Sequence, residues 1–460
     1  MNKKLFIFIL VIVSLFIVTC ANQSAKLDSQ KTPLLETTPL TIWWTRGFYP
    51  EEDEAIKQIV AQWEKKSGYP VELLFFNDNE SLKITLLEAV TAEKPPDIVY
   101  NYELEFGISP RLAWEDKLAD VSDVIEPVKS LYTETALASV YLNNNVAKKR
   151  SYYAVPIQQQ TIHIHYWQDL LEKINLKKSD IPNEWDKFWQ FWQNAQKTIR
   201  QKDQSEIYGI GLTMSAASVD NFYEFEQILE VYDVNLLDKN GKLQVDKPEV
   251  RQGIITVLNW ITNLYKDGYI PPDSVQWAAI DNNVNFLNHN LLMVVNPTLS
   301  IPTSQRQDTE VYQNQIQTIE FPDEPDGEPP KYLVSVKQIL TFQSSSNLEQ
   351  AKNFLSFFIR PENISEYLQL SGGRYFPVMP QLLSDKFWQD NSDPHISVAV
   401  KQYQEGVTRP FNYVVNPAYS QVLSENVWGK AIERVIVDGL SIEGATDEAI
   451  AKIQEIFAQW

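Results

Sequence analysis

Two groups of aromatic and polar residues directly follow two apolar segments near the start of the chain. These residues are Trp43, Trp44 and Arg46 at the end of "PLTIWWT", and Asn101, Tyr102 and Glu103 after "PPDIVY". In open parallel sheets, ligands bind where strands end at their carboxyl ends. Planar rings can cover the C–H faces of a sugar, and amide, carboxylate and guanidinium groups can bond its hydroxyls. The two groups therefore predict a binding site for a hydroxyl-rich ligand, with one of the two tryptophans in the core because neighbouring strand side chains face opposite ways.

Catalytic chemistry is the alternative to binding. A glycoside hydrolase needs two carboxylates at a defined separation, one with a raised pKa. The chain has 60 acidic residues, but none stands in a recognisable catalytic setting. His163 and His165 share one face of a predicted strand, yet no thiol completes a metal set, so a structural pair is the favoured interpretation. The sequence also lacks a Gly-x-Ser-x-Gly elbow and a phosphate-binding glycine loop. We expect no enzyme, no metal and no cofactor.

The single cysteine of the chain, Cys20, closes an N-terminal apolar segment. Lys3 and Lys4 precede an uncharged run over 5–18, which is too short to cross a bilayer. A basic start and a short apolar run are typical of a secretory signal. "IVTC" resembles a bacterial lipobox, although Thr19 departs from its usual small residue. We expect a signal peptide at 1–19 and a lipid on Cys20, followed by a polar tether over 20–40.

The composition of the chain excludes some classes of binding partner. The chain has 460 residues and a net charge of −20, which argues against general nucleic-acid binding. The 44 % hydrophobic content is ample for sizeable cores, and the length favours two to three domains.

The segments after residue 39 alternate between strand and helix patterns. "PLTIWWT", "VELLFF" and "PPDIVY" are predicted strands, and "EEDEAIKQIVAQWEKKSG" and "SLKITLLEAVTAE" are predicted helices. This order predicts a parallel sheet covered by helices. The pattern restarts after residue 155 with the strand "TIHIHYW" and the helix "NEWDKFWQFWQNAQKTI". The aromatic residues of that helix recur at i, i+3, i+4 and i+7, which favours core packing over a binding stripe.

The order of segments resembles the extracellular solute-binding proteins of bacterial ABC importers, in the carbohydrate branch that includes maltose-binding protein. Matching stretches include "LTIWWT", "AEKPPDIVY", "YYAVPIQQQTIHIHYW", "FLNHNLLMVVNP", "GGRYFPV" and "RPFNYVVNPAYSQV". They extend over nearly the whole chain after residue 40. The resemblance implies an α/β fold of two lobes, each a mostly parallel sheet flanked by helices, joined by a hinge. It implies crossings near 156–160 and 335–340, with lobe 1 over 41–156 plus 337–385 and lobe 2 over 157–336 plus 386–460.

The resemblance adds site residues to the two groups above. Gln160 stands where a relative has a ligand-contacting acid. Tyr223 lies in a segment that contributes an aromatic ring to the cleft, and Arg374 and Tyr375 follow two glycines in a loop near it. Asn296 belongs to a family motif that here lacks its glycine near residue 289 and its tryptophan near residue 298. Two further rings, Trp277 and Tyr419, complete the expected site, and either Trp277 or Tyr375 could replace the missing tryptophan.

The implied function is capture of a small-molecule ligand, expected to be a carbohydrate, by lobe closure. The partners would be ABC permease subunits and the membrane that holds the lipid anchor, outside the cytoplasmic membrane of a bacterial cell. We expect a monomer. The alternatives are a polyamine, glycerol-phosphate or peptide ligand on the same scaffold, and a secreted glycoside hydrolase.

Overall fold

The computed structural model describes residues 38–203 and 206–460. The predicted signal peptide, Cys20 and most of the predicted tether lie outside the described residues. Within them, no helix combines the length and the hydropathy needed to span a membrane.

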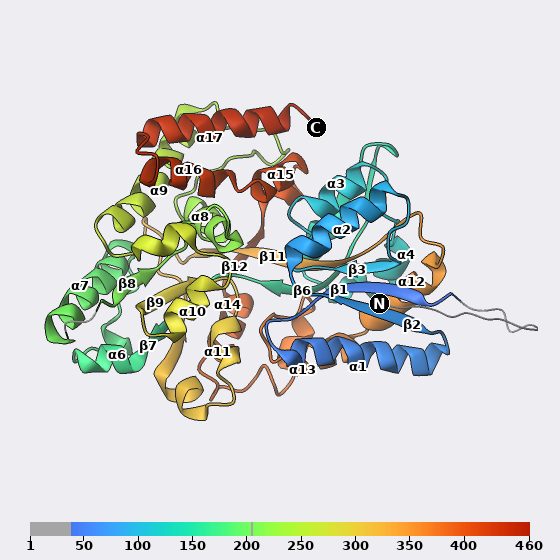
Figure 1. The fold of residues 1–460 in the computed structure, drawn as a ribbon, viewed down its shortest axis with the longest axis horizontal. Coiled ribbons are helices and arrows are strands. Elements are labelled where there is room, and N and C mark those ends of the chain that lie inside the picture. Colours follow the sequence, from blue (N-terminus) through green and yellow to red (C-terminus); the bar gives the residue numbers. More distant parts are fainter. Residues whose placement is uncertain (1–37, 204–205) are drawn as a thin grey trace, which may run out of the picture. The chain divides into compact units, whose positions relative to one another are not determined.

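The first sheet has six strands in the order β12-β11-β3-β1-β2, with β6 also paired to β11. Its strands are β1 (Leu40–Thr45), β2 (Val71–Phe76), β3 (Ile98–Tyr100), β6 (Val155–Gln160), β11 (Lys331–Thr341) and β12 (Val407–Pro410). Strand β1 runs parallel to β2 and β3, as the βαβαβ pattern predicts. Figure 1 shows α2 (Asn79–Thr91) and α3 (Ile108–Trp114) on one face of these strands, and α1 (Pro50–Ser67) and α13 (Pro361–Leu370) on the other.

Helix α1 shows how local sequence sets the elements. Pro50 occupies its first turn, where a missing N–H costs nothing, and Gly68 ends it in the left-handed conformation with φ 70°. The apolar face predicted from the sequence is buried, including Ile59, Val60 and Trp63. Glu52 and Asp53 in the first turn are also buried, which the helical pattern does not predict.

The second sheet has four strands in the order β10-β7-β9-β8. They are β7 (His163–Trp167), β8 (Tyr208–Gly211), β9 (Leu291–Asn296) and β10 (Ile316–Ile319). The longer helices of its core are α7 (Trp185–Asp203), α8 (Val219–Val231), α9 (Pro248–Lys266), α16 (Val427–Ile436) and α17 (Ile442–Phe457). The aromatic residues of α7 are buried there, which confirms core packing. A separate hairpin pairs β4 (Tyr141–Asn144) with β5 (Lys149–Tyr152).

Each sheet therefore has its own hydrophobic core, and the two predicted crossing segments pair with one another. Strands β6 and β11 are antiparallel, with Gln160 opposite Ser335 and Val155 opposite Ile339. Strand β11 spans both cores, since Tyr332 packs in the core of the second sheet and Val336 in that of the first. The other α-helices of the described residues are α4 (Ser122–Ile125), α5 (Glu134–Val140), α6 (Gln168–Lys173), α10 (Asp281–Leu287), α11 (Ser300–Ser304), α12 (Leu348–Phe358), α14 (Ile396–Glu405) and α15 (Ala418–Ser424). The exact lobe boundaries stay a prediction.

Trp44 provides a test of the first core. Its ring is 1 % exposed and stacks on Tyr100 at 4.2 Å, whereas Trp43 on the opposite strand face is only partly buried. Trp44→Ala is expected to lower the free energy of unfolding by about 3–5 kcal/mol, because it removes a large buried side chain and leaves a cavity. Urea denaturation measures this loss, and Trp43→Ala is the matched control with a smaller expected loss. Equal losses in the two variants would contradict the placement of Trp44 in the core.

Candidate functional site

A cavity of about 70 Å³ lies where residues from both sheets meet. It adjoins a cavity of about 390 Å³, with which it shares Asn79, Glu103, Val219 and Ala279. The smaller cavity is lined by Phe48, Asn79, Tyr102, Glu103, Gln160, Val219, Asp220, Tyr223, Ala279, Asn283, Asn296, Pro297, Thr298, Ser300, Lys337, Arg374 and Tyr375. Most of these residues follow strands or begin helices, as expected for a site at the carboxyl ends of strands. By volume the smaller cavity holds roughly five water molecules at ~10–15 Å³ each.

Seven of the residues expected from the sequence lie in this lining. They are Tyr102, Glu103, Gln160, Tyr223, Asn296, Arg374 and Tyr375. The rings of Tyr102 and Tyr375 are stacked with centroids 5.8 Å apart. The side chain of Gln160 makes no hydrogen bond to any described residue, so its amide is available to a ligand.

The other six expected residues lie outside the lining. They are Trp43, Trp44, Arg46, Asn101, Trp277 and Tyr419. Trp277 is buried, and its indole N–H donates to Asp273 at 3.2 Å. Tyr419 is buried against Glu226 in the core of the second sheet. Arg46 is half exposed and pairs with Asp53 at 2.6 Å. For these residues, direct ligand contact has no support in the geometry.

Asn101 does not line the cavity, but it forms hydrogen bonds with two residues that do. Its Nδ2 donates to the backbone oxygen of Asn79 at 2.9 Å, and its Oδ1 accepts from the backbone N–H of Glu103 at 2.8 Å. Both partners line the cavity, so the fully buried Asn101 positions two lining residues.

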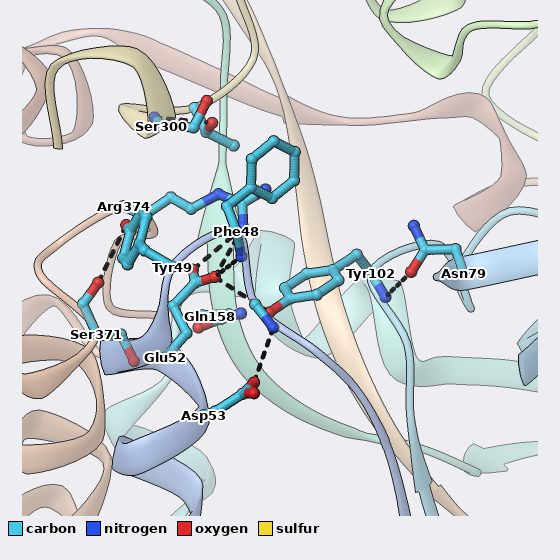
Figure 2. Close-up of polar contacts among 12 residues, drawn as sticks. Phe48, Tyr49, Glu52, Asp53, Asn79, Tyr102, Gln158, Ser300, Ser371 and Arg374 are labelled. Atoms are coloured by element: carbon cyan, nitrogen blue, oxygen red, sulfur yellow. Dashed lines mark hydrogen bonds and ion pairs between the residues drawn. The ribbon is translucent and has the colours of Figure 1, made fainter. Parts of the chain in front are cut away.

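Arg374 and Glu52 form a buried ion pair beside the cavity (Figure 2). Arg374 Nη1 lies 3.1 and 3.0 Å from the two Glu52 oxygens. Glu52 also accepts from the backbone N–H of Phe48 at 2.6 Å. The guanidinium carbon is 3.9 Å from the centroid of the Phe48 ring. The pair therefore holds the loop after β1 against the lining residues Arg374 and Tyr375.

The charge state of this pair follows from arginine chemistry. Burial raises the pKa of Glu52, and Arg374 opposes that shift. Burial lowers the pKa of Arg374, but Glu52 together with the neighbouring tyrosines outweighs burial and raises it. We take the pair as ionised, because arginine does not lose its proton in proteins and Glu52 accepts several donors.

Lys337 and Glu105 form a second buried ion pair, at 2.6 Å, on the strand β11 that joins the two cores. Lys337 Nζ also donates to the Tyr102 backbone oxygen at 2.7 Å and to the Tyr223 hydroxyl at 3.1 Å. Burial lowers the pKa of Lys337, and Glu105 opposes that shift. This ammonium thus links the loop after β3 to α8 of the other core.

The remaining charged groups of the lining differ in their partners. Glu103 accepts from Asn79 Nδ2 at 2.7 Å and faces Lys83 Nζ at 3.3 Å. Asp220, in the first turn of α8, accepts from Asn282 Nδ2 at 2.9 Å. No Lys or Arg among the described residues forms an ion pair with it. Burial raises the pKa of Asp220 to about 7.

Sequence reasoning missed several lining residues, among them Phe48, Asn79, Asp220, Asn283, Ser300 and Lys337. Only Lys337 carried a usable signal, since a lone lysine inside the apolar strand "YLVSVKQILT" implies a buried acidic partner. Asn79 and Asp220 start helices and have the composition of ordinary first turns.

The two histidines considered as a metal pair are buried, and each is hydrogen-bonded to a different side chain. His163 Nδ1 lies 2.5 Å from Gln402 Oε1, and His165 Nδ1 lies 2.9 Å from Thr318 Oγ1. Thr318 also bonds His395 Nδ1 at 2.6 Å. Over residues 38–203 and 206–460, the one acidic or histidine group close enough to share an ion comprises Asp233, Glu324 and Asp326. Lys331 Nζ already lies 2.6 Å from Glu324 and 3.3 Å from Asp233.

The site can therefore hold a small polar ligand by hydrogen bonds to amides and hydroxyls and by contact with Phe48, Tyr102, Tyr223 and Tyr375. Its acids and bases are held in ion pairs or bonded to amides, and no nucleophile is paired with a general base in the manner that covalent catalysis needs.

Comparisons with known proteins agree with this description. Residues 58–396 match the model of the bacterial extracellular solute-binding protein family. The chain belongs to that family, which is one of binding proteins.

Particular relatives are distant in sequence. YcjN of Escherichia coli (strain K12), named as an ABC transporter periplasmic-binding protein, is 23 % identical over 239 residues, which is 52 % of this chain. The match spans about half the length of that relative. A Thermotoga lettingae TMO ABC transporter solute-binding protein, solved with α-D-tagatose, superimposes with a TM-score of 0.73 at 19 % identity, covering 91 % of this chain and 99 % of the other. Maltose-bound MalE3 of T. maritima gives 0.72 at 18 % identity, covering 90 % and 99 %. These structures confirm the two-lobed α/β fold.

The buried pair of Arg374 and Glu52 generates one prediction. Arg374→Met is expected to lower the free energy of unfolding by about 3–5 kcal/mol, because it leaves a buried carboxylate without its partner. The double variant Glu52→Gln/Arg374→Met should lose less than the sum of the single variants. Urea denaturation measures the cycle. Arg111→Met removes the exposed pair with Glu115 and should change stability by less than about 1 kcal/mol. Additive losses in the cycle would contradict a coupled pair.

The buried histidines generate a second, pH-dependent prediction. Burial lowers the pKa of His163 to about 4 and lowers the pKa of His165 and His395 as well. A group with a lowered pKa binds fewer protons when folded, so stability is lost as the pH falls below the unfolded value near 6.5. Between pH 7 and pH 4, the wild type should lose on the order of 3 kcal/mol relative to His163→Gln. Parallel stability curves for the two proteins in urea denaturation would show that His163 does not titrate this way.

Proposed function

We propose that this chain is the solute-binding component of a bacterial ABC importer and that its ligand is a carbohydrate. Lobe closure on the ligand captures it, and the closed protein delivers it to a membrane permease. The protein is not an enzyme in this proposal. A lipid on Cys20 anchors it outside the cytoplasmic membrane, on the strength of the N-terminal pattern alone.

The carbohydrate proposal rests on the ion pairs that neutralise most of the charged groups lining the cavity. Lys337 is paired with Glu105, Arg374 with Glu52, and Glu103 with Lys83, so none of these groups offers a free charge to a ligand. Apart from Asp220, the other polar lining residues are amides and hydroxyls, including Gln160, Asn283, Thr298 and Ser300. Neutral donors and acceptors next to aromatic rings match a polyol better than they match an anion.

The paired charges also weigh against the alternatives. A glycerol-phosphate needs uncommitted basic groups, and both bases of the lining are neutralised by buried acids. A dipeptide carries a carboxylate, which also needs an uncommitted basic group, and both bases of the lining are already paired with acids.

The test is thermal unfolding and calorimetry of the purified protein with mono- and oligosaccharides, amino acids, polyamines, dipeptides and glycerol-phosphate. A ligand at ~100 times its dissociation constant adds about 2.7 kcal/mol of stability. We expect one sugar class to bind. Gln160→Ala should weaken that binding about fivefold, because it removes one neutral hydrogen bond worth about 1 kcal/mol. Gln190→Ala, an exposed glutamine on α7, is the matched control and should leave the affinity unchanged.

Other outcomes would contradict parts of the proposal. Binding of a polyamine, peptide or glycerol-phosphate in the absence of any sugar response would keep the fold and overturn the carbohydrate ligand. Release of shorter sugars from an oligosaccharide during the same measurement would favour a glycoside hydrolase.

A further inference from the structure

One charged group of the cavity stands apart from the ion pairs described above. Asp220 is 6 % exposed, lines the cavity and forms no ion pair with any residue of the described ranges. Its Oδ2 accepts from Asn282 Nδ2 at 2.9 Å, while no hydrogen-bond donor among the described residues reaches its Oδ1. A buried carboxylate in this situation is costly unless a donor or a cation satisfies it.

A second acceptor on the same wall also lacks a donor. Asn283 follows Asn282 on α10, lines the same cavity and is 7 % exposed. Its Nδ2 donates to Ser300 Oγ at 3.0 Å, but its Oδ1 is buried without a partner. The wall formed by the first turn of α8 and by α10 therefore presents more acceptors than donors.

The charged groups around Asp220 also determine which charge a ligand can carry at this wall. The titratable groups that act on Asp220 are Arg374 and Lys337, each already paired with an acid, and Glu103, which is paired with Lys83. One turn along α8 lies Glu224, a second buried acid whose Oε1 has no partner. Counting the pairs as neutral leaves only acidic groups on this wall, so a positive charge is favoured there.

We propose that the ligand is an amino sugar whose protonated amine binds Asp220 and Asn283. This inference rests on the carbohydrate proposal and specifies its substituent. An ammonium has three donors and a positive charge, so it can satisfy both free acceptors and neutralise the carboxylate. The amides and hydroxyls across the cavity bind the ring hydroxyls.

The experiment is calorimetry of the purified protein with matched sets of sugars that differ at one substituent: glucose, glucosamine and N-acetylglucosamine, the galactose set, and the dimers cellobiose, chitosan dimer and N,N′-diacetylchitobiose. We expect one amino sugar to bind about 10–100-fold tighter than its hydroxyl and N-acetyl analogues, as expected for one charge-assisted hydrogen bond. In D220N this preference should disappear. Asp186→Asn removes an exposed acid of α7 outside the cavity, and it should leave the affinities for all members of a set unchanged.

Proton release gives an independent measurement that needs no variant. At pH 6 the amine is charged, and the empty Asp220, with a pKa of about 7, is mostly protonated. Binding of the ammonium favours the carboxylate, so calorimetry in buffers of different ionisation enthalpy should show release of nearly one proton. If D220N fails to fold, this count and the wild-type affinity ratio decide the question.

The outcomes separate this inference from the proposed function. Equal or tighter binding of a neutral sugar, or an amino-sugar preference that persists in D220N, overturns the inference and leaves the carbohydrate function standing. Binding of putrescine or spermidine without any sugar response overturns both.

Discussion

Lys337 sets the main constraint on the architecture, because its ammonium lies out of water where the two cores meet. A buried, unpaired lysine would cost several kcal/mol, so every nearby element has to present an acceptor. Glu105 supplies the opposite charge, Tyr102 a backbone oxygen, and Tyr223 and Ser335 supply hydroxyl oxygens. These groups come from the loop after β3, from α8 and from β11 itself. The arrangement of both cores is thus coupled to one charge.

The same constraint shapes the cavity. Two of the residues that accept from Lys337, namely Tyr102 and Tyr223, line the cavity, so this part of its wall is held in place before a ligand binds. The pair of Arg374 and Glu52 holds another part of the wall, where the guanidinium lies over the Phe48 ring. Both pairs are poor sources of stability compared with apolar residues of similar volume. Their value lies in fixing the position of polar groups, which lowers the ordering cost of binding.

Much of the fold followed from the sequence, and rather less of the site. The β1–α1–β2–α2–β3 order and the buried face of α7 are local patterns, and the structure has both of them. Tyr102, Glu103, Gln160 and Arg374 reach the cavity because they occupy positions just after strands or glycines. Trp44 does not, because strand parity alone leaves open which of two neighbouring rings faces inward. Asp220 could not be found at all, since its first-turn position on α8 is ordinary and only the three-dimensional packing removes it from basic partners.

The buried titratable groups also oppose one another in their effect on stability. Burial raises the pKa of three acids on α8, namely Asp220, Glu224 and Glu226, so the folded state binds more protons than the unfolded state at these sites. Their contribution to stability is present at low pH and is lost as the pH rises from about 4 through their folded pKa values. The buried histidines have the reverse sign over nearly the same interval, because His163 and His395 have folded pKa values of about 4. The two sets partly cancel. Total stability can therefore vary little between pH 4 and 7 while individual sites change protonation, and Asp220 can couple to a ligand's charge without unfolding the protein.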